Sequence, residues 1–451
     1  MLSANFALVI FLSLKNTPLA FLSAYSYERL NGLHQIAGYT SFAYLVLHAA
    51  MYTRYFLVND KIEVLQEAST VAGIVAGFAF LGIVISAAII RKIWYEAFYV
   101  IHIVCFIVAL VCASYHQPGL EAGLIIIFGL IAAMWVADRA IRAARLLYRS
   151  VNNEATLEPL PEGGTKITLT KRPFGAVPGK HCFLWIPQIR MFESHPFTIV
   201  ASEPLEFVVN AHDGFTRDLH RHALASPGVK LKASVDGPYG TFPDPMEFDR
   251  VVLVAGGSGA SFTFGLAVNM LERMWPESTK HITFIWTVKK HDNLKWFSKH
   301  LQTLRTHDHS PKVNVSLYTT RAPSTTDSDS DSRGSVGISE HTINSPSRPI
   351  RGNDEKALEH GIVPATSEDS MATAYSLADA TITNLHRDIK AGRPDTAALI
   401  REAVSSTPAH QRVLVAACGP DGLMRVVRDT TASLIRGDGP GVELHCEQFG
   451  W

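Results

Sequence analysis

Long apolar runs separated by short polar breaks fill the first third of the chain. A membrane-spanning helix needs about 20 mostly apolar residues. Runs of that kind predict five spans, near residues 2–22, 32–56, 70–90, 95–115 and 120–140. The first run has the length of a signal peptide, but it lacks a basic start and is followed by further spans. We therefore interpret it as a membrane helix.

After residue 148 the pattern becomes that of a soluble protein. Residues 151–247 contain short alternating runs such as "TKITLTK", "HCFLWIP" and "LEFVVNA", broken by Pro and Gly, which predict a small antiparallel barrel. Residues 248–451 contain buried-type strands such as "VVLVAG", "HITFIWTV", "VNVSLYTT" and "RVLVAACGP", separated by helical stretches. This alternation predicts an α/β domain with a mostly parallel sheet. The predicted domains are therefore 1–148, 151–247 and 248–451.

One segment of the last domain, residues 322–370, is rich in Ser, Asp, Thr, Pro and Gly and almost free of aromatic residues. Such a composition cannot bury a core, so we expect a disordered insertion between strands. A phosphorylation target and a neutral spacer are the two interpretations that remain open.

Charge sets the expected orientation in the membrane but excludes little else. Lys+Arg and Asp+Glu are both 41, so no excess of positive charge indicates nucleic-acid binding. The five cysteines form no CxxC pair, so they do not indicate a zinc ribbon, a dithiol motif or a disulfide framework. Basic residues collect in cytoplasmic loops, whereas the loop 55–69 is acidic. We therefore expect the N-terminus outside and the soluble half in the cytoplasm. The basic residues behind this orientation are Lys15, Arg29, Arg91, Lys92, Arg139, Arg142, Arg145 and Arg149.

Four histidines stand out in the membrane half: His34, His48, His102 and His116. They form two pairs, each on one predicted span and each separated by fourteen residues, which is about 21 Å and almost four helical turns. Each pair therefore shares a helix face, and two facing helices would offer two stacked imidazole pairs, each able to ligate a haem iron axially. Hydrogen bonding between helices, a proton path and a metal-transport site are the alternatives.

Several short motifs of the soluble half suggest cofactor binding, although each is weak alone. They are "HPFT" (195–198), "GFT" (214–216), "DGPYG" (236–240) and the glycines that follow strand 251–255. A Gly-rich turn between a strand and a helix can bind a pyrophosphate, although a tight turn alone explains these glycines equally well. In a parallel sheet the ligand lies at the carboxyl ends of the strands, here Gly256–Gly259, Thr287, Thr320–Arg321 and Cys418–Pro420.

Taken in order, the paired histidines, HPFT, GFT, the Gly-rich turn, "CGP" and the terminal "EQFGW" resemble the ferric reductase and NADPH oxidase superfamily. "SYERLNGLH" and "WYEAFYVIH" are most similar to fungal ferric-chelate reductases. The resemblance implies an α-helical transmembrane haem-binding bundle followed by a ferredoxin-reductase-like module, made of an antiparallel β-barrel FAD domain and an α/β NADPH-binding domain. Since only five spans are predicted, we expect the family's first core helix and its large extracytoplasmic extension to be missing.

The resemblance also implies roles for individual residues. His34 and His102 would ligate the inner haem, and His48 and His116 the outer haem. FAD would be bound by His195, Pro196, Phe197 and Thr198 at its ring and ribityl region, and by Gly214, Phe215 and Thr216 at its pyrophosphate. NADPH would be bound by Gly256, Gly257 and Gly259 at its pyrophosphate, by Cys418, Gly419 and Pro420 at its nicotinamide, and by Arg393 at its 2′-phosphate. Trp451 would cover one face of the flavin.

The activity that follows from this resemblance is electron transfer across the plasma membrane. Electrons would pass from cytoplasmic NADPH through FAD and two b haems to a ferric chelate, or to Cu²⁺, outside. A superoxide-generating NADPH oxidase would use the same path with O2 as acceptor, and an inactive membrane scaffold is the alternative of another class. We expect no nucleic-acid partner, and the sequence leaves open whether a partner subunit or a second copy takes part.

Overall fold

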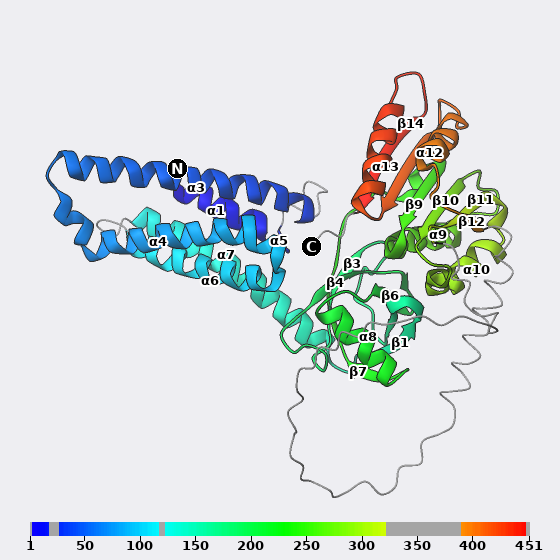
Figure 1. Cartoon of the computed structure of the whole chain (residues 1–451), viewed down its shortest axis with the longest axis horizontal. Coiled ribbons are helices and arrows are strands. Elements are labelled where there is room, and N and C mark those ends of the chain that lie inside the picture. Colours follow the sequence, from blue (N-terminus) through cyan, green and yellow to red (C-terminus); the bar gives the residue numbers. More distant parts are fainter. Residues whose placement is uncertain (1, 18–26, 117–121, 322–388, 448–451) are drawn as a thin grey trace, which may run out of the picture.

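The computed structural model describes residues 2–17, 27–116, 122–321 and 389–447. Figure 1 shows a bundle of long helices with the sheet-containing part of the chain at one end of it. The principal helices of the bundle are α1 (Leu2–Ser13), α3 (Tyr27–Val58), α4 (Ala68–Ile85), α6 (Tyr95–Tyr115) and α7 (Ala122–Arg149). Shorter turns are η1 (Ile62–Gln66), the π-helical η2 (Ser86–Ile90) that extends α4, and α5 (Arg91–Ile93).

The bundle is held together by apolar side chains that meet at its centre. Helix α1 packs against α3 and α7, and α4 packs against α6. The Phe6 ring of α1 lies 5.1 Å from the Phe80 ring and 6.0 Å from the Phe106 ring, measured between ring centres. Ala109 and Ile131 are fully buried beside them. Because lipid is as apolar as these side chains, it is their close van der Waals packing that holds the helices together.

The five predicted spans correspond to five helices, but the structure changes two of them. Among the described residues, the helices long and apolar enough to cross a membrane are Ala68–Ile93, Tyr95–Tyr115 and Gly123–Arg149. Helix α1 ends at Ser13, so the expected span 2–22 is too long, and residues 18–22 of it lie outside the described part. Helix α3 has 32 residues, which is enough length, but its polar side chains make it less apolar than the other three.

The second part of the chain, predicted as an antiparallel barrel, consists of two antiparallel sheets around one core. The sheets have the strand orders β5-β6-β2-β1-β7 and β4-β3-β8. Strands and turns of this part are β1 (Glu154–Leu160), η4 (Pro161–Gly163), β2 (Gly164–Leu169), β3 (His181–Trp185), β4 (His195–Thr198), β5 (Ala201–Ser202), β6 (Leu205–Asn210), β7 (Lys230–Lys232) and β8 (Ser234–Tyr239).

The barrel part also contains a helix that the sequence analysis did not predict. We expected a small antiparallel barrel over residues 151–247 and no helix, but Phe215–Ala225 form helix α8. Phe215, Leu219 and Ala223 are buried in the barrel core. Their spacing of four residues is the helical period, so it is the signal that could have revealed α8.

The third part contains a six-stranded sheet in which every pairing is parallel, with the order β12-β11-β10-β9-β13-β14. Helices α9 and α10 cover one face and α12 and α13 the other. The elements are η5 (Pro245–Glu247), β9 (Arg250–Gly256), η6 (Gly257–Gly259), α9 (Ala260–Arg273), β10 (His281–Val288), η7 (His291–Phe297), α10 (Ser298–Thr306), η8 (Ser310–Lys312), β11 (Val313–Thr319), β12 (Ile389–Ala391), α12 (Thr396–Ser405), β13 (Arg412–Cys418), α13 (Asp421–Leu434) and β14 (Gly441–Glu447). The predicted insertion 322–370 lies outside the described residues.

Candidate functional site

Two pairs of imidazole rings join α3 to α6 at different depths of the bundle. The ring centres of His34 and His102 are 6.5 Å apart. Those of His48 and His116 are 6.2 Å apart. His116 is the residue that caps the C-terminus of α6. The equal spacing of fourteen residues on both helices thus brings the four histidines together in the pairs that helix geometry predicts.

The separation of the rings can be compared with what a bound iron requires. A metal–imidazole bond is about 2 Å long, and a ring centre lies about 1.1 Å from its nitrogen, so two axial ligands of one iron have ring centres about 6 Å apart. The observed 6.5 Å and 6.2 Å fit this requirement for both pairs. The four histidines are therefore suitable as the axial ligands of two haems.

Main-chain carbonyl groups orient one histidine in each pair. The Nδ1 atom of His34 lies 2.8 Å from the carbonyl oxygen of Val9 on α1. The Nδ1 atom of His116 lies 2.8 Å from the carbonyl oxygen of Ser69 on α4. A carbonyl oxygen only accepts hydrogen bonds, so each Nδ1 must carry the proton and donate it. This tautomer leaves Nε2 as the ligating nitrogen.

A serine at a helix irregularity contacts the third histidine. Ser86 is the first residue of the π-helical turn η2, and its hydroxyl donates to the carbonyl of Ile83 at 2.7 Å. The same hydroxyl oxygen lies 3.3 Å from Nδ1 of His102. Turns of this kind inside α-helices are frequent at functional sites. Nothing in the apolar run 70–90 distinguished this serine in advance.

In the barrel, the HPFT segment forms strand β4 and pairs with β3. The ring of His195 stacks on Phe215, with ring centres 4.6 Å apart. Phe197 lies 6.2 Å from the same ring. Thr198 is buried, whereas His195, Pro196 and Phe197 are partly accessible. Two motifs that are far apart in the sequence, HPFT and GFT, therefore meet at one place on the barrel.

The GFT motif begins helix α8. Gly214 precedes the helix with a φ of +67°, in the left-handed region that favours glycine. The Phe215 side chain is buried, and the Thr216 hydroxyl accepts from the backbone N–H of His212 at 2.9 Å. The motif can therefore offer a phosphate the backbone N–H groups of a helix N-terminus rather than the side chain of Phe215.

Charged residues beside these motifs were missed by the sequence reading. Arg190 forms an ion pair with Asp218 of α8 at 2.7 Å. It also contacts Glu193 at 3.2 Å, and Glu193 in turn lies 3.1 Å from Nε2 of His195. The available signal was the run "QIRMFES" directly before HPFT, whose charges we did not interpret. Arg190 adds a cation next to the N-terminus of α8.

In the α/β part, the Gly-rich turn packs against the end of β13. A Cβ atom on Gly259 would lie 2.2 Å from the carbonyl oxygen of Cys418. A Cβ atom on Gly256 would lie 2.6 Å from Cδ of Pro420. Neither position can hold a side chain without a shift of the backbone. Two predicted elements, the glycines and the CGP segment, are thereby brought into contact at the carboxyl edge of the sheet.

Gly257 serves this turn in another way. Its φ is +57°, and a Cβ atom built on it would meet nothing within 4 Å. The indole N–H of Trp286 on β10 donates to the Gly257 carbonyl at 3.0 Å, and this hydrogen bond holds the turn in place. The backbone of the turn therefore lies in a fixed conformation with open space on one side, as a pyrophosphate-binding turn requires.

Cys418 lies at the centre of this edge but is buried, with 2% of its surface exposed. Burial raises the pKa of the Cys418 thiol, and the nearby Glu447 carboxylate raises it further. The thiol therefore stays protonated at neutral pH, so it can line a binding surface but cannot act as a nucleophile.

Two predicted site residues remain, Arg393 and Trp451, and the structure describes only the first. Arg393 is exposed and follows β12, which is three strands from β9 along the sheet. It lies at the same carboxyl edge as the Gly-rich turn because all six strands run parallel. Trp451 lies outside the described residues, so its proposed position over the flavin stays a prediction.

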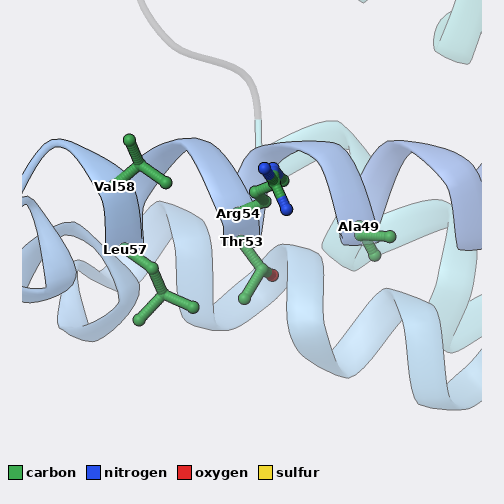
Figure 2. A pocket seen from close by; sticks show the side chains of 6 residues that line it. Ala49, Thr53, Arg54, Leu57 and Val58 are labelled. Carbon is green, nitrogen blue, oxygen red and sulfur yellow. The ribbon is translucent and has the colours of Figure 1, made fainter.

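A shallow groove on α3 begins directly after His48 in the sequence but is not lined by it. Figure 2 shows its lining side chains along one helix. They are Ala49, Ala50, Thr53, Arg54, Leu57 and Val58. The groove shares no residue with the predicted sites for haem, flavin or dinucleotide.

This fold and site define a membrane protein in which a helical bundle able to hold haem is joined to an antiparallel β-barrel and a parallel α/β domain. Three family models match the chain in the same order. "Ferric reductase like transmembrane component" matches residues 1–113, "FAD-binding domain" matches 151–242 and "Ferric reductase NAD binding domain" matches 248–432. The chain belongs to the ferric reductase family.

Fungal relatives match along most of the chain. Ferric/cupric reductase transmembrane component 2 of Saccharomyces cerevisiae is 26% identical over 96% of this chain and 58% of its own length. Ferric reductase transmembrane component 3 of the same yeast has the same three values. Probable cell surface ferric reductase kap2 of Aspergillus oryzae is 27% identical over 69% of this chain and 45% of its own length. The chain spans less than two thirds of the length of these relatives.

Proposed function

We propose that this protein is an NADPH-dependent ferric-chelate reductase that carries electrons across a membrane. The observation that carries the proposal is the spacing of the two histidine pairs, 6.5 Å and 6.2 Å between ring centres, at two depths of one bundle. When bound, FAD would supply the conversion of a two-electron hydride from NADPH into single electrons, and the two haems would supply one-electron carriers towards the acceptor.

The residues of the chain bind and orient these groups. His34 and His102 hold the inner haem, and His48 and His116 the outer one. Strand β4 (His195–Thr198) and the N-terminus of α8 hold FAD, with the cation of Arg190 beside its phosphates. The Gly-rich turn and the segment Cys418–Pro420 hold NADPH, with Arg393 at its 2′-phosphate and Trp451 over the flavin. No side chain has to act as an acid or base.

The acceptor is proposed from the relatives and the location from the membrane half. With histidine on both sides of each iron, the haems would transfer electrons without binding the acceptor, which holds for a ferric reductase and for an oxidase alike. The fungal relatives are named ferric and ferric/cupric reductases, so we propose ferric chelates, and Cu²⁺ as a second substrate, as acceptors on the outer side of the plasma membrane. The basic residues in the C-terminal turns of α7 (Arg139, Arg142, Arg145 and Arg149) support a cytoplasmic location for the flavin and dinucleotide parts.

The test is a paired assay on membranes that contain the protein. With NADPH as donor, ferric-chelate reduction and superoxide release are measured side by side. We expect chelate reduction that superoxide dismutase does not suppress and that His48→Ala abolishes. Release of two superoxide ions for each NADPH consumed would instead identify an NADPH oxidase, because NADPH gives two electrons and each O2 takes one. Absence of both activities in a protein with full haem and FAD content would favour the scaffold.

A further inference from the structure

Two arginines of α7 form ion pairs with one buried aspartate of the barrel. The Nε atom of Arg142 lies 2.6 Å from one carboxylate oxygen of Asp236, and Arg145 lies 3.1 Å from the other. The Asp236 side chain is 0% exposed. A buried carboxylate is costly unless it is paired and hydrogen-bonded, so this aspartate depends on both arginines.

Further bonds connect the same two elements. The hydroxyl of Ser234 donates to the carbonyl of Leu146 at 2.7 Å, and Arg149 donates to the carbonyl of Gly237 at 2.6 Å. The phenol of Tyr239 donates to Asp236 at 2.9 Å. Burial raises the pKa of Tyr239, and the Asp236 charge raises it further, so the phenol stays a neutral donor. Strand β8 is thus bonded to α7 at several successive residues.

The register of the sheet connects this contact to the predicted flavin strand. Asp236 pairs with Phe183 of β3, and Phe183 pairs with Pro196 of the HPFT segment. Lys15 of the membrane half also lies over the Phe183 ring, 3.2 Å from its centre. The position of Asp236 against α7 therefore sets the position of HPFT relative to the bundle.

A second contact involves the helix that carries the inner histidine. Glu96 lies in the first turn of α6, six residues before His102. A Cβ atom on Gly214 would lie 3.3 Å from a carboxylate oxygen of Glu96. The N-terminus of α8, where we place the FAD phosphates, is therefore next to the start of α6. The barrel contacts the bundle at the end nearest the inner histidine pair.

We propose that Asp236, Arg142 and Arg145 form a docking lock that holds the flavin strand against the inner histidine pair. The inference rests on the proposed function, because it concerns the step from flavin to haem. Asp236 is a positioning residue, since it acts through the register of β8, β3 and β4. The four residues 150–153 between α7 and β1 are the covalent link, and the lock restrains the barrel around it.

The test separates hydride transfer from NADPH to flavin from electron transfer between the flavin part and the haem-binding bundle. The purified holoprotein in lipid nanodiscs is mixed with NADPH without oxygen, and the haem absorbance is followed by stopped flow. Reduction of a soluble quinone dye, which takes electrons from flavin directly, is measured in parallel with the FAD and haem contents. The variants are Arg142→Gln with Arg145→Gln, and the same two changes combined with Asp236→Asn, which leaves no buried carboxylate without a counter-charge. Asp244→Asn is the control, since it breaks the ion pair with Arg273 inside the soluble half.

The lock predicts that haem reduction slows roughly tenfold or more in the Arg142/Arg145 double variant and in the variant that also carries Asp236→Asn. Dye reduction and both cofactor contents should stay at the wild-type level. Arg142→Lys alone keeps the positive charge, so this variant should keep most of the wild-type rate of haem reduction. The Asp244→Asn control should match wild type in both assays. Wild-type haem reduction in the double variant, or a parallel loss of dye reduction, would overturn the inference. If haem in the wild-type protein is not reduced by NADPH although the dye is, the proposed function fails instead.

Discussion

Substitution of Gly259 by alanine tests the contact between the Gly-rich turn and β13. The new Cβ atom would lie 2.2 Å from the carbonyl oxygen of Cys418 and 2.6 Å from its carbonyl carbon. Real Cβ atoms essentially never come closer than 3.0 Å to a neighbour, so the two backbones would have to separate by almost another ångström. Since the obstacle is backbone, no rotation of a side chain can relieve it.

The expected cost is large for a single methyl group. Overpacking of a filled core costs about 1–3 kcal/mol, and a clash between backbones belongs at the upper end of that range. Separation of β9 from β13 should also displace the N–H groups of the turn, so we expect a raised KM for NADPH. The matched control is Gly422→Ala in helix α13, where nothing lies within 4 Å of the new Cβ. That change should be neutral or stabilise by up to about 1 kcal/mol.

The assay for Gly259→Ala is urea unfolding of the purified protein, combined with steady-state kinetics at varied NADPH. We expect a lower midpoint and a higher KM for Gly259→Ala, and neither change for Gly422→Ala. If Gly259→Ala unfolds at the wild-type urea concentration and keeps its KM, the turn does not pack on Cys418. The assignment of this edge as a dinucleotide site would then lose its structural basis.

Four other substitutions test the remaining sites. His48→Ala should remove one of two haems from the absorption spectrum and leave FAD bound, because bundle and barrel have separate cores. Thr198→Val should lower FAD occupancy while the haem spectrum persists, and equal loss of both cofactors would indicate misfolding. Arg393→Ala should raise KM for NADPH by roughly ten- to a hundredfold, the loss of a charge-assisted contact, and barely change KM for NADH; equal effects on both would exclude a 2′-phosphate contact. Burial lowers the pKa of His300 from 6.5 to about 4. Stability should therefore be complete above pH 6.5 and fall by up to about 3 kcal/mol towards pH 4, and His300→Leu should remove this slope in urea midpoints measured at several pH values.

Helix periodicity was enough to predict the histidine pairs. The spacing of fourteen residues is a local property, and it places His34 and His48 on one face whatever surrounds them. The same holds for the buried strands of the α/β part, whose apolar runs correspond to β9, β10, β11 and β13. Patterns within a single element therefore gave most of the architecture.

Features that depend on distant partners could not be predicted. Arg142 and Asp236 are 94 residues apart in the sequence. From the sequence alone, Arg142 is one of the basic residues that set the membrane orientation, and Asp236 is part of a loop motif. Helix α1 stops at Ser13, and the backbone N–H of Asn16 just beyond it donates to Asp138 of α7 at 3.0 Å. The barrel helix α8 was missed because we considered GFT only as a cofactor-binding motif, although Phe215 and Leu219 follow the helical period. In each case the missing information was the position of another element.

The depth difference between the two histidine pairs has a consequence for membrane voltage. Fourteen helical residues rise about 21 Å, which is about two thirds of a hydrocarbon core roughly 30 Å thick. An electron that moves from the inner pair to the outer pair carries charge through that fraction of the electric field. A unit charge that crosses the whole membrane gains or loses about 2.3 kcal/mol per 100 mV, so this step is worth about 1.5 kcal/mol per 100 mV. Under the proposed function and orientation, with the cell interior negative, the field would drive the electron outward, and each turnover would reduce the membrane potential unless a cation left with the electron.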